Sequence, residues 1–190
     1  MFSVVPVKYR GRPLTKEART AAELASYDFL DSLSMGYDRV DHDYADTIED
    51  CHAVETVLGN PICKNLFLCN RQKTQYYLLM MQGDKVFKTK DLSKQLGVSR
   101  LSFAGAEDME ALLGVHPGSV TVLGLMNDKA HKVQLVMDKP IYAADLISCH
   151  PCISTSTLTV TRQDLLEKFL PATGHTPIVV DLPLPEENAE

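Results

Sequence analysis

Residues 64–81 of the chain have the sequence KNLFLCNRQKTQYYLLMM, and this stretch decides the fold class. Its two apolar runs, 65–69 and 75–81, are separated by the polar segment 70–74. Short runs rich in leucine, phenylalanine and tyrosine are typical of strands, and a polar connection of this length predicts a β-hairpin with a longer loop. The centre of the chain is therefore expected to contribute an antiparallel strand pair to a sheet.

Helical patterns lie on both sides of this hairpin. On the N-terminal side, apolar residues recur on one stripe from a Thr15 cap to residue 33, and Gly36 suits the end of that helix. Thr47, with Asp50 three positions later, resembles a capping box and predicts a second helix that ends at Gly59. Shorter helices are predicted at 91–96, 106–113 and 164–170.

The remaining apolar segments predict strands that do not alternate strictly with helices. They cover residues 37–42, 119–125, 132–137, 156–161 and 178–180. Such an order favours an α+β fold with a mixed sheet over a doubly wound one. No linker divides the chain, so we expect an extended arm at 1–14, one domain at 15–182 and an acidic, disordered tail at 183–190.

The chain has 190 residues, of which 45 % are hydrophobic, and a net charge of −6. No apolar run reaches the ~20 residues that span a bilayer, and no signal peptide is recognised. A cytoplasmic protein with no membrane partner is therefore expected. The acidic balance disfavours a broad nucleic-acid surface such as a DNA-binding face, but it is compatible with a small basic rim that holds one RNA end.

Cys149 and Cys152 form the C-x-x-C pattern of some redox and zinc proteins. A redox thiol of this kind normally lies at a helix N-terminus, whereas here a predicted strand precedes the pattern and a β-rich stretch follows it. No second C-x-x-C completes a zinc site. Thiol-redox chemistry and a structural zinc site therefore remain as minor alternatives.

Two short segments point more specifically to a ligand. Lys64 and Asn65 precede an apolar strand, where a lysine usually extends along the apolar surface to solvent. Pro117 and Gly118 fit the central positions of a type II turn, and a turn with little side chain lets backbone N–H groups approach an anion or a carbonyl. Each segment alone also has a purely structural interpretation.

The two segments belong to an ordered series of fragments. The series is Lys64-Asn65-Leu66-Phe67-Leu68, Arg100-Leu101-Ser102-Phe103-Ala104, Pro117-Gly118-Ser119-Val120, Gly124-Leu125-Met126-Asn127-Asp128, His150-Pro151 and Thr155. In this order it resembles the YbaK/ProX family of aminoacyl-tRNA editing proteins, which is associated with prolyl-tRNA synthetase. The similar branch is the PrdX or ProXp-ala type, and the likeness runs from residue 23 to residue 181.

The resemblance implies a single α+β domain around a curved, barrel-like mixed sheet flanked by helices. It implies a deacylase that acts in trans on mischarged tRNA(Pro), with alanyl-tRNA(Pro) as the usual substrate and with no metal or organic cofactor. The expected partner is the acceptor 3′ end of that tRNA. Prolyl-tRNA synthetase and an elongation factor are the protein partners expected beside it.

The resemblance also assigns roles to residues. Lys64 matches the family's essential lysine, and the backbone of Gly118 is expected to face the scissile ester. His150 is expected to line the pocket, and an imidazole there suits an acid, a base or a positioning group equally. The residues expected to bind substrate are Asn65, Pro117, Ser119, Ser154 and Thr155.

The chain departs from the related pattern in two places. That pattern usually continues as His-Pro-x-x-Asn-Thr, whereas Ser154 occupies the asparagine position here. Residues 121–124 are Thr-Val-Leu-Gly, where many relatives have Pro-Phe-Gly. A pocket of altered size leaves two alternatives open: a deacylase for serine or cysteine, and a non-catalytic module that binds tRNA or the synthetase.

Overall fold

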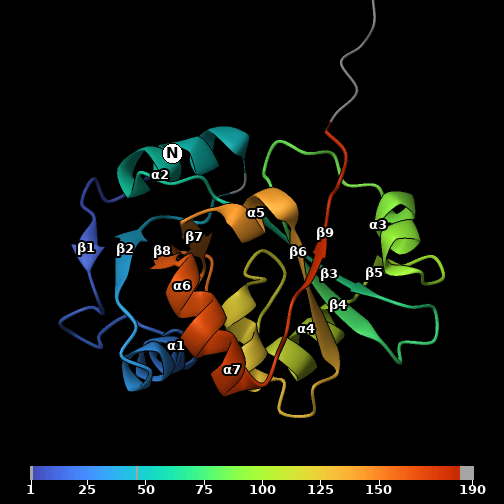
Figure 1. Cartoon of the computed structure of the whole chain (residues 1–190). Coiled ribbons are helices and arrows are strands. Elements are labelled where there is room, and N and C mark those ends of the chain that lie inside the picture. Colours follow the sequence, from blue (N-terminus) through green and yellow to red (C-terminus); the bar gives the residue numbers. More distant parts are fainter. Residues whose placement is uncertain (1, 46, 185–190) are drawn as a thin grey trace, which may run out of the picture.

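The computed structural model describes residues 2–45 and 47–184, in which the strands form two open sheets (Figure 1). The strands are β1 (Tyr9–Arg10), β2 (Tyr37–Asp41), β3 (Lys64–Cys69), β4 (Tyr76–Met81), β5 (Ser102–Phe103), β6 (Val133–Asp138), β7 (Leu146–Cys149), β8 (Ser156–Thr161) and β9 (Ile178–Val180). One sheet has the order β1-β2-β8-β7 and is antiparallel throughout. The other has the order β5-β3-β4-β6-β9 and is mixed, because β4, β6 and β9 run parallel.

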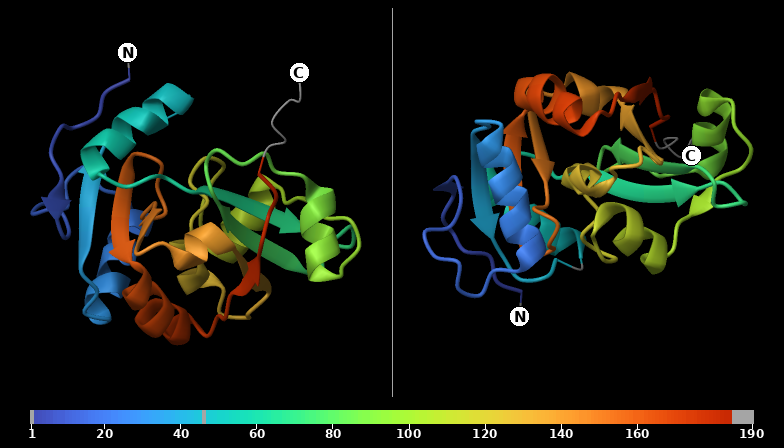
Figure 2. Two further views of the ribbon diagram at one scale, coloured as in Figure 1. Left: turned by 45° about the horizontal axis from the view of Figure 1, so that its top comes forward. Right: turned by 90° about the horizontal axis from the view of Figure 1, so that it is seen from below.

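The two sheets lie side by side and helices surround them (Figure 2). Helix α3 (Thr89–Leu96) packs on the five-stranded sheet at the end of the molecule away from the four-stranded sheet. The helices are α1 (Ala21–Ser32), α2 (Ile48–Leu58), α3 (Thr89–Leu96), α4 (Ala106–Leu113), the 3-10 helix η1 (Val122–Asn127), α5 (Lys139–Ala143), α6 (Arg162–Asp164), the π-helical turn η2 (Leu165–Phe169) and α7 (Leu170–Thr173). The α+β class and the mixed sheet are thus confirmed. The strands of the described residues do not close into a barrel, because each sheet keeps two free edges.

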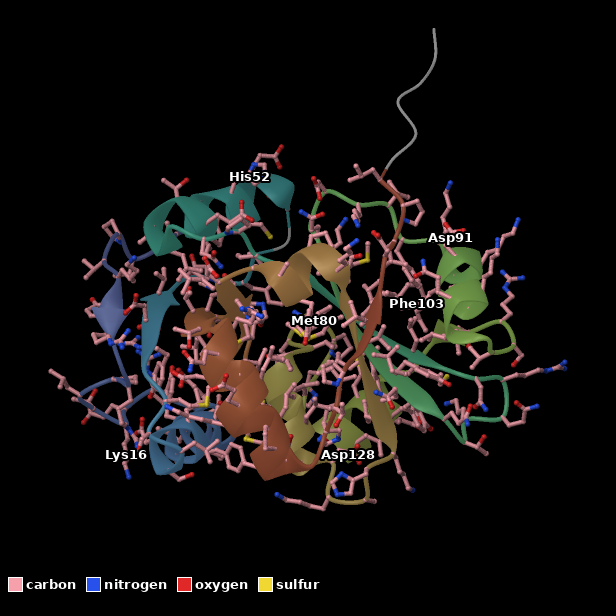
Figure 3. The ribbon with its side chains drawn as sticks, in the orientation of Figure 1. Lys16, His52, Met80, Asp91, Phe103 and Asp128 are labelled. Carbon is pink, nitrogen blue, oxygen red and sulfur yellow. The ribbon has the colours of Figure 1, made fainter. Side chains whose placement is uncertain are left out.

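The central hairpin forms as predicted, with β3 and β4 paired antiparallel from Lys64 opposite Met81 to Cys69 opposite Tyr76. Its side chains alternate between two cores, as a pleated strand requires. Phe67 joins the main core between the two sheets, and Leu68 joins a second core under α3. Met80, at the centre of the molecule in Figure 3, is fully buried. Burial of each such side chain contributes about 1.5–3 kcal/mol.

The predicted start of the second helix is confirmed, and that of the first is wrong. Thr47 and Asp50 exchange backbone-to-side-chain hydrogen bonds of 3.1 Å each, and Gly59 ends α2 with a φ of 75°. The first helix is capped by Thr20 and not by Thr15. Ala18 adopts a left-handed φ of 59°, so a helix cannot continue through residue 18.

Two other elements differ from the sequence-based expectation. Residues 122–125 of the predicted strand 119–125 belong instead to the 3-10 helix η1, which is capped by the Thr121 hydroxyl, an acceptor for the N–H of Leu123. The C-terminal helical run extends from Arg162 to Thr173, so Pro171 lies inside it and Gly174 ends it.

The N-terminal segment contacts the four-stranded sheet. Within residues 1–14, β1 pairs with β2, and Val4 forms a bridge with His42. Residues 185–190 of the predicted tail lie outside the described residues. None of the helices in the described part of the chain has the length and apolar character that a bilayer crossing requires.

Candidate functional site

The ends of β3 and β7 bring two predicted site residues to the same part of the molecule. Lys64 begins β3, and His150 directly follows β7. Ser148 connects these ends, since its carbonyl accepts from Cys63 Sγ at 3.4 Å and its hydroxyl accepts from Asn60 Nδ2 at 2.7 Å. The fold thus places Lys64 and His150 at adjacent strand ends, although they are distant in sequence.

The Lys64 ammonium rests on a carbonyl oxygen that is itself firmly held. Lys64 Nζ donates to the Lys85 carbonyl at 3.0 Å. The Lys85 side chain is only 3 % exposed, and its Nζ lies 2.8 Å from Asp138 Oδ2 and 2.6 Å from the Leu182 carbonyl. Asp138 is fully buried at the end of β6. A buried ion pair therefore fixes the loop on which Lys64 rests.

Lys64 and Asn65 point to opposite faces of β3, because successive residues of a strand alternate. Asn65 lies on the face of Cys63, whose carbonyl accepts from Asn65 Nδ2 at 3.5 Å. Among the described residues, no hydrogen bond or ion pair joins Lys64 to Gly118 or to His150. The strand ends are brought together, but the ammonium stays on the Lys85 carbonyl.

The predicted turn at Pro117 and Gly118 is present. Ser119 N donates to the His116 carbonyl at 3.0 Å, and Gly118 has a φ of 86°, as the third position of a type II turn requires. Pro117 and Gly118 are exposed, whereas Ser119 is buried. The Ser119 hydroxyl points into the turn, since it donates to the His116 carbonyl at 2.9 Å and accepts from its N–H at 3.1 Å.

Thr121 connects this turn to His150. The Thr121 side chain is fully buried, and its hydroxyl donates to the His150 carbonyl at 2.8 Å. Because Thr121 lies three residues after Gly118, this bond fixes the turn next to His150. The turn that contains the exposed Gly118 and the residue that carries the His150 imidazole are therefore neighbours in the fold.

The hydrogen bonds of His150 define its tautomer. His150 Nδ1 lies 2.8 Å from the Ser156 carbonyl, which can only accept, so Nδ1 carries the proton. In the neutral ring Nε2 is then the acceptor. His150 is half-buried, so this nitrogen is suited to take a proton from a bound molecule.

His42 is a site residue that the sequence reasoning missed. Its Nδ1 lies 2.7 Å from the Asp43 carbonyl and its Nε2 lies 2.8 Å from Thr157 Oγ1, so both nitrogens are occupied. Thr157 Oγ1 also lies 3.4 Å from His150 Nδ1, and the two imidazole centroids are 6.3 Å apart. His42 therefore orients the Thr157 hydroxyl next to His150. A single histidine after a short strand gave no signal for this role.

Ser154 and Thr155 lie in the turn between His150 and β8. Ser154 is half-buried, Thr155 is exposed, and the Thr155 carbonyl accepts from His42 N at 3.0 Å. This hydrogen bond joins the turn that follows His150 to the backbone of His42. The substrate contacts expected of Ser154 and Thr155 remain predictions.

Comparison with known proteins decides the family. Residues 42–168 match the model of the aminoacyl-tRNA editing domain, and this range contains Lys64, Gly118 and His150. The chain belongs to this family. The resemblance inferred from the fragments around Lys64 and Gly118 is therefore confirmed.

Individual relatives agree with this assignment. The prolyl-tRNA editing protein ProX of Acetoanaerobium sticklandii is 31 % identical over 153 residues, which cover 80 % of this chain and 93 % of that protein. Prolyl-tRNA synthetase associated domain-containing protein 1 of Danio rerio is 30 % identical over 155 residues, covering 80 % and 83 %. A solved structure of a candidate trans-editing enzyme for prolyl-tRNA synthetase superposes with a TM-score of 0.65 at 15 % identity, covering 87 % of this chain and all of that one. The last likeness concerns the fold.

The cysteines of this editing domain are poorly suited to redox chemistry. Cys149 and Cys152 are free and buried, and burial raises the pKa of the Cys152 thiol to about 11. Burial also raises the pKa of Cys149, and the neighbouring Cys63 and Cys152 raise it further. A thiol must ionise to react, so a raised pKa disfavours the reactive form of both. The two cysteines pack in the main core, and this burial does not favour the redox alternative.

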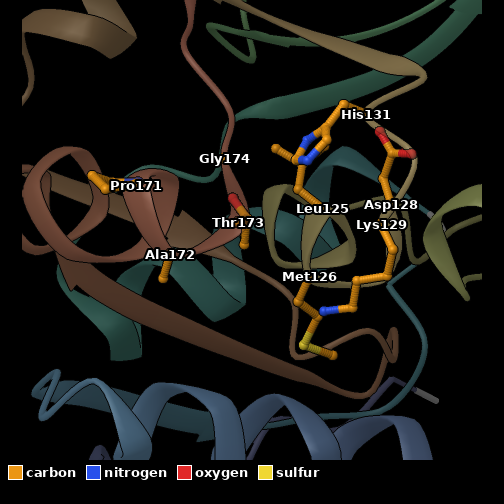
Figure 4. Close-up of a pocket in the computed structure, with 9 residues that line it drawn as sticks. All are labelled: Leu125, Met126, Asp128, Lys129, His131, Pro171, Ala172, Thr173 and Gly174. Atoms are coloured by element: carbon orange, nitrogen blue, oxygen red, sulfur yellow. The ribbon is translucent and has the colours of Figure 1, made fainter.

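A cavity of about 240 Å³ lies apart from these residues, between η1 and α7 (Figure 4). It is lined by Leu125, Met126, Asp128, Lys129, His131, Pro171, Ala172, Thr173 and Gly174. Two of these lining residues are bonded to the buried His175, whose Nε2 lies 3.2 Å from Asp128 Oδ2 and whose Nδ1 lies 3.1 Å from Thr173 Oγ1. Asp128 also accepts the N–H groups of Lys132 and Val133. These bonds hold the turn before β6 against α7, which is a structural role.

The two site histidines predict a stability that falls in acid. Burial lowers the pKa of His42 and of His150 below the usual 6.5, and His42 lowers that of His150 further. Below pH 6.5 the unfolded chain therefore binds more protons than the folded one, so the free energy of unfolding decreases as the pH falls. Above that pH the contribution is fully present.

Urea unfolding measured from about pH 7.5 to about pH 5.5 tests this sign. The wild type is expected to lose stability over the window, and His150→Gln is expected to show a shallower dependence. Parallel curves for the two proteins would contradict a lowered pKa for His150.

Proposed function

We propose that the chain is a trans-acting deacylase that hydrolyses the ester of mischarged tRNA(Pro), with alanyl-tRNA(Pro) as its first expected substrate. One observation carries the proposal: the Thr121 hydroxyl holds the Gly118 turn against His150, whose Nδ1 bonds the Ser156 carbonyl and whose Nε2 makes no hydrogen bond to the described residues. The names of the relatives that match this chain support tRNA(Pro) as the carrier. Seryl and cysteinyl esters are the alternative substrates, because Ser154 alters the pocket.

The chemistry needs an activated water and a stabilised oxyanion. His150 Nε2 orients the water and takes its proton as the water oxygen attacks the ester carbonyl. Alternatively, the 2′-hydroxyl of the terminal ribose accepts that proton while it gives its own proton to the leaving 3′ oxygen. The carbonyl oxygen becomes negative and is stabilised by the N–H groups of the Gly118 turn and by the Lys64 ammonium. The proton then passes to the leaving 3′ oxygen, which yields free tRNA and the amino acid.

Lys64 must change partner to take this part. Its Nζ now donates to the Lys85 carbonyl, an uncharged acceptor, and a hydrogen bond with one charged partner contributes about 1.5–3 kcal/mol. A negatively charged ester oxygen or a phosphate is the stronger acceptor for an ammonium. Substrate binding is therefore expected to draw the exposed end of Lys64 from Lys85 toward the 3′ end of the tRNA.

Such an activity removes an error that arises when a synthetase recognises an amino acid by apolar contacts alone. A synthetase pocket for proline rejects a smaller amino acid only weakly, because each missing methylene changes binding by about 1–3 kcal/mol. A second site that admits the smaller residue and excludes proline removes the error. We place this editing domain at residues 15–182 and its activity in the cytoplasm, with prolyl-tRNA synthetase or an elongation factor as the expected source of tRNA.

Electrostatic binding of the tRNA body outside its acceptor end is expected to be weak. Three arginines of the N-terminal segment are paired with acidic groups: Arg10 with Asp38 at 3.0 Å, Arg12 with Asp28 at 2.8 Å and Arg19 with Asp41 at 2.7 Å. Paired cations release few counterions on RNA binding, so the salt dependence of binding should be modest.

Replacing His150 with glutamine tests the assignment of the base. The single-turnover rate constant on alanyl-tRNA(Pro) is expected to fall by about 10²-fold, since positioned proton transfer contributes 10²–10⁴-fold. His52→Gln is the matched control, because His52 is exposed on α2. Equal rates in His150→Gln and the control would mean that His150 is not the base. The ribose 2′-hydroxyl would then remain as the group that passes the proton from the water to the leaving oxygen.

A non-catalytic module predicts a different outcome. If wild-type protein binds tRNA(Pro) without hydrolysis, Ser154→Asn restores the family's amide at that position. A gain of hydrolysis in Ser154→Asn from an inactive parent supports a degenerate site and contradicts the deacylase proposal.

A further inference from the structure

An aromatic ring from a distant part of the chain covers one side of the Gly118 turn. A Cβ atom built on Gly118 would lie 2.8 Å from both Cε2 and Cζ of Tyr44, and closer still to its Oη. The phenol ring therefore fills the space into which any side chain at residue 118 would project. Tyr44 lies in the connection between β2 and α2, two residues after His42.

This connection is held on its N-terminal side. His42 N donates to the Thr155 carbonyl at 3.0 Å, and Asp43 N donates to the Ser3 carbonyl at 2.8 Å. Ser3 N donates in return to Asp43 Oδ2 at 2.9 Å. Tyr44 thus follows two residues whose backbone is fixed by other segments, so its ring is held over the turn.

The contact does not serve to bury the ring. Tyr44 remains 45 % exposed, whereas Tyr27 and Tyr37 in the main core are 0 % and 2 % exposed. A tyrosine that packs on a glycine turn and stays open to solvent can contact a molecule bound at that turn. The β2–α2 connection supplies both this ring and His42, which orients Thr157.

We propose that Tyr44 limits the size of the amino acid that this site accepts, by occupying the space beside Gly118. The inference rests on the proposed deacylase function, in which the ester lies against the Gly118 backbone. An alanyl group presents a single methyl group there. A prolyl ring is larger and meets the phenol, so correctly charged tRNA(Pro) is spared by a steric clash.

The test compares Tyr44→Ala, Tyr44→Val and Tyr44→Phe with the wild type, on alanyl-tRNA(Pro) and prolyl-tRNA(Pro). Each kcat/KM is measured, and the readout is the proline-to-alanine ratio. Removal of the ring is expected to raise this ratio by about 10–100-fold, the range that a few methylene-sized contacts provide. Tyr44→Phe keeps the ring and should keep the wild-type ratio, with Tyr44→Val between the extremes.

Two results would overturn the inference. An unchanged ratio in Tyr44→Ala, with both rates lowered alike, makes Tyr44 a general substrate contact and leaves the deacylase proposal standing. A wild type that hydrolyses no aminoacyl-tRNA overturns the deacylase proposal and this inference together.

The packing itself is checked without activity. Gly118→Ala should lower Tm, because of its positive φ and the clash with Tyr44. Adding Tyr44→Ala should recover part of that loss, because the clash is removed while the backbone strain remains. No recovery in the double variant would contradict the contact.

Discussion

Lys64→Ala is expected to lower the rate of deacylation by about 10²–10³-fold, the range found when one group that stabilises an oxyanion is removed. The free energy of unfolding should fall by no more than about 1.5–3 kcal/mol, because the exposed side chain makes one hydrogen bond, from its ammonium to the Lys85 carbonyl. Single-turnover hydrolysis of alanyl-tRNA(Pro) and urea unfolding measure the two quantities separately.

Lys132→Ala is the matched control, since Lys132 is an exposed lysine next to the opposite end of the same sheet, where Val133 pairs with Tyr76. It should retain wild-type rates. Full activity in Lys64→Ala would remove Lys64 from the mechanism and leave the Gly118 turn as the only oxyanion site proposed.

Lys85→Met is expected to cost about 3–5 kcal/mol of folding free energy, because it leaves the Asp138 carboxylate buried without its partner. Methionine keeps the volume of the side chain but offers no donor to Asp138 or to the Leu182 carbonyl. Urea unfolding should show this loss as a lower midpoint. This would be the largest stability effect that we predict.

Two further variants separate the buried charge from simple truncation. Lys85→Met combined with Asp138→Asn should recover much of the loss, because asparagine removes the charge and still accepts from Leu182 N through Oδ1. Lys139→Met breaks the neighbouring exposed pair with Asp181, at 3.4 Å, and should cost less than about 1 kcal/mol. Equal costs for Lys85→Met and Lys139→Met would contradict the role assigned to the buried pair.

Local chemistry made part of the fold predictable. The capping box of Thr47 and Asp50 needs only two side chains and nearby backbone, so the sequence predicts it correctly. The first helix shows the limit of such reasoning. Thr15 and Thr20 are both residues that can cap a helix, and a left-handed Ala18 excludes the earlier cap.

Non-local packing decided the elements that the sequence did not predict. Residues 119–125 are apolar enough for a strand, but Gly124 packs so closely on Leu113 that a Cβ atom built on Gly124 would lie 3.0 Å from the Leu113 Cβ, and the Thr121 hydroxyl caps a 3-10 turn. Likewise, the division into two sheets depends on the pairing of Tyr37 with Val160, which are far apart in sequence. The family resemblance implied one curved mixed sheet, and it did not specify that the strands divide into a four-stranded and a five-stranded sheet.

The candidate site was predictable where a motif carries it. The turn at Gly118 follows from Pro-Gly chemistry, and its φ of 86° agrees. His42 and Tyr44 had no motif, because each acts through a contact with a distant residue: Thr157 for His42 and Gly118 for Tyr44. The hydrogen bond from Lys64 to the Lys85 carbonyl could not be predicted from the sequence either, since it depends on how the buried Lys85 is held.

The most direct test of the central claim is deacylation of tRNA(Pro) carrying alanine, serine, cysteine or proline, each at limiting enzyme. We predict rapid loss of one small amino acid, alanine first, with the prolyl ester spared. Binding of these tRNAs without hydrolysis of any of them would contradict the account.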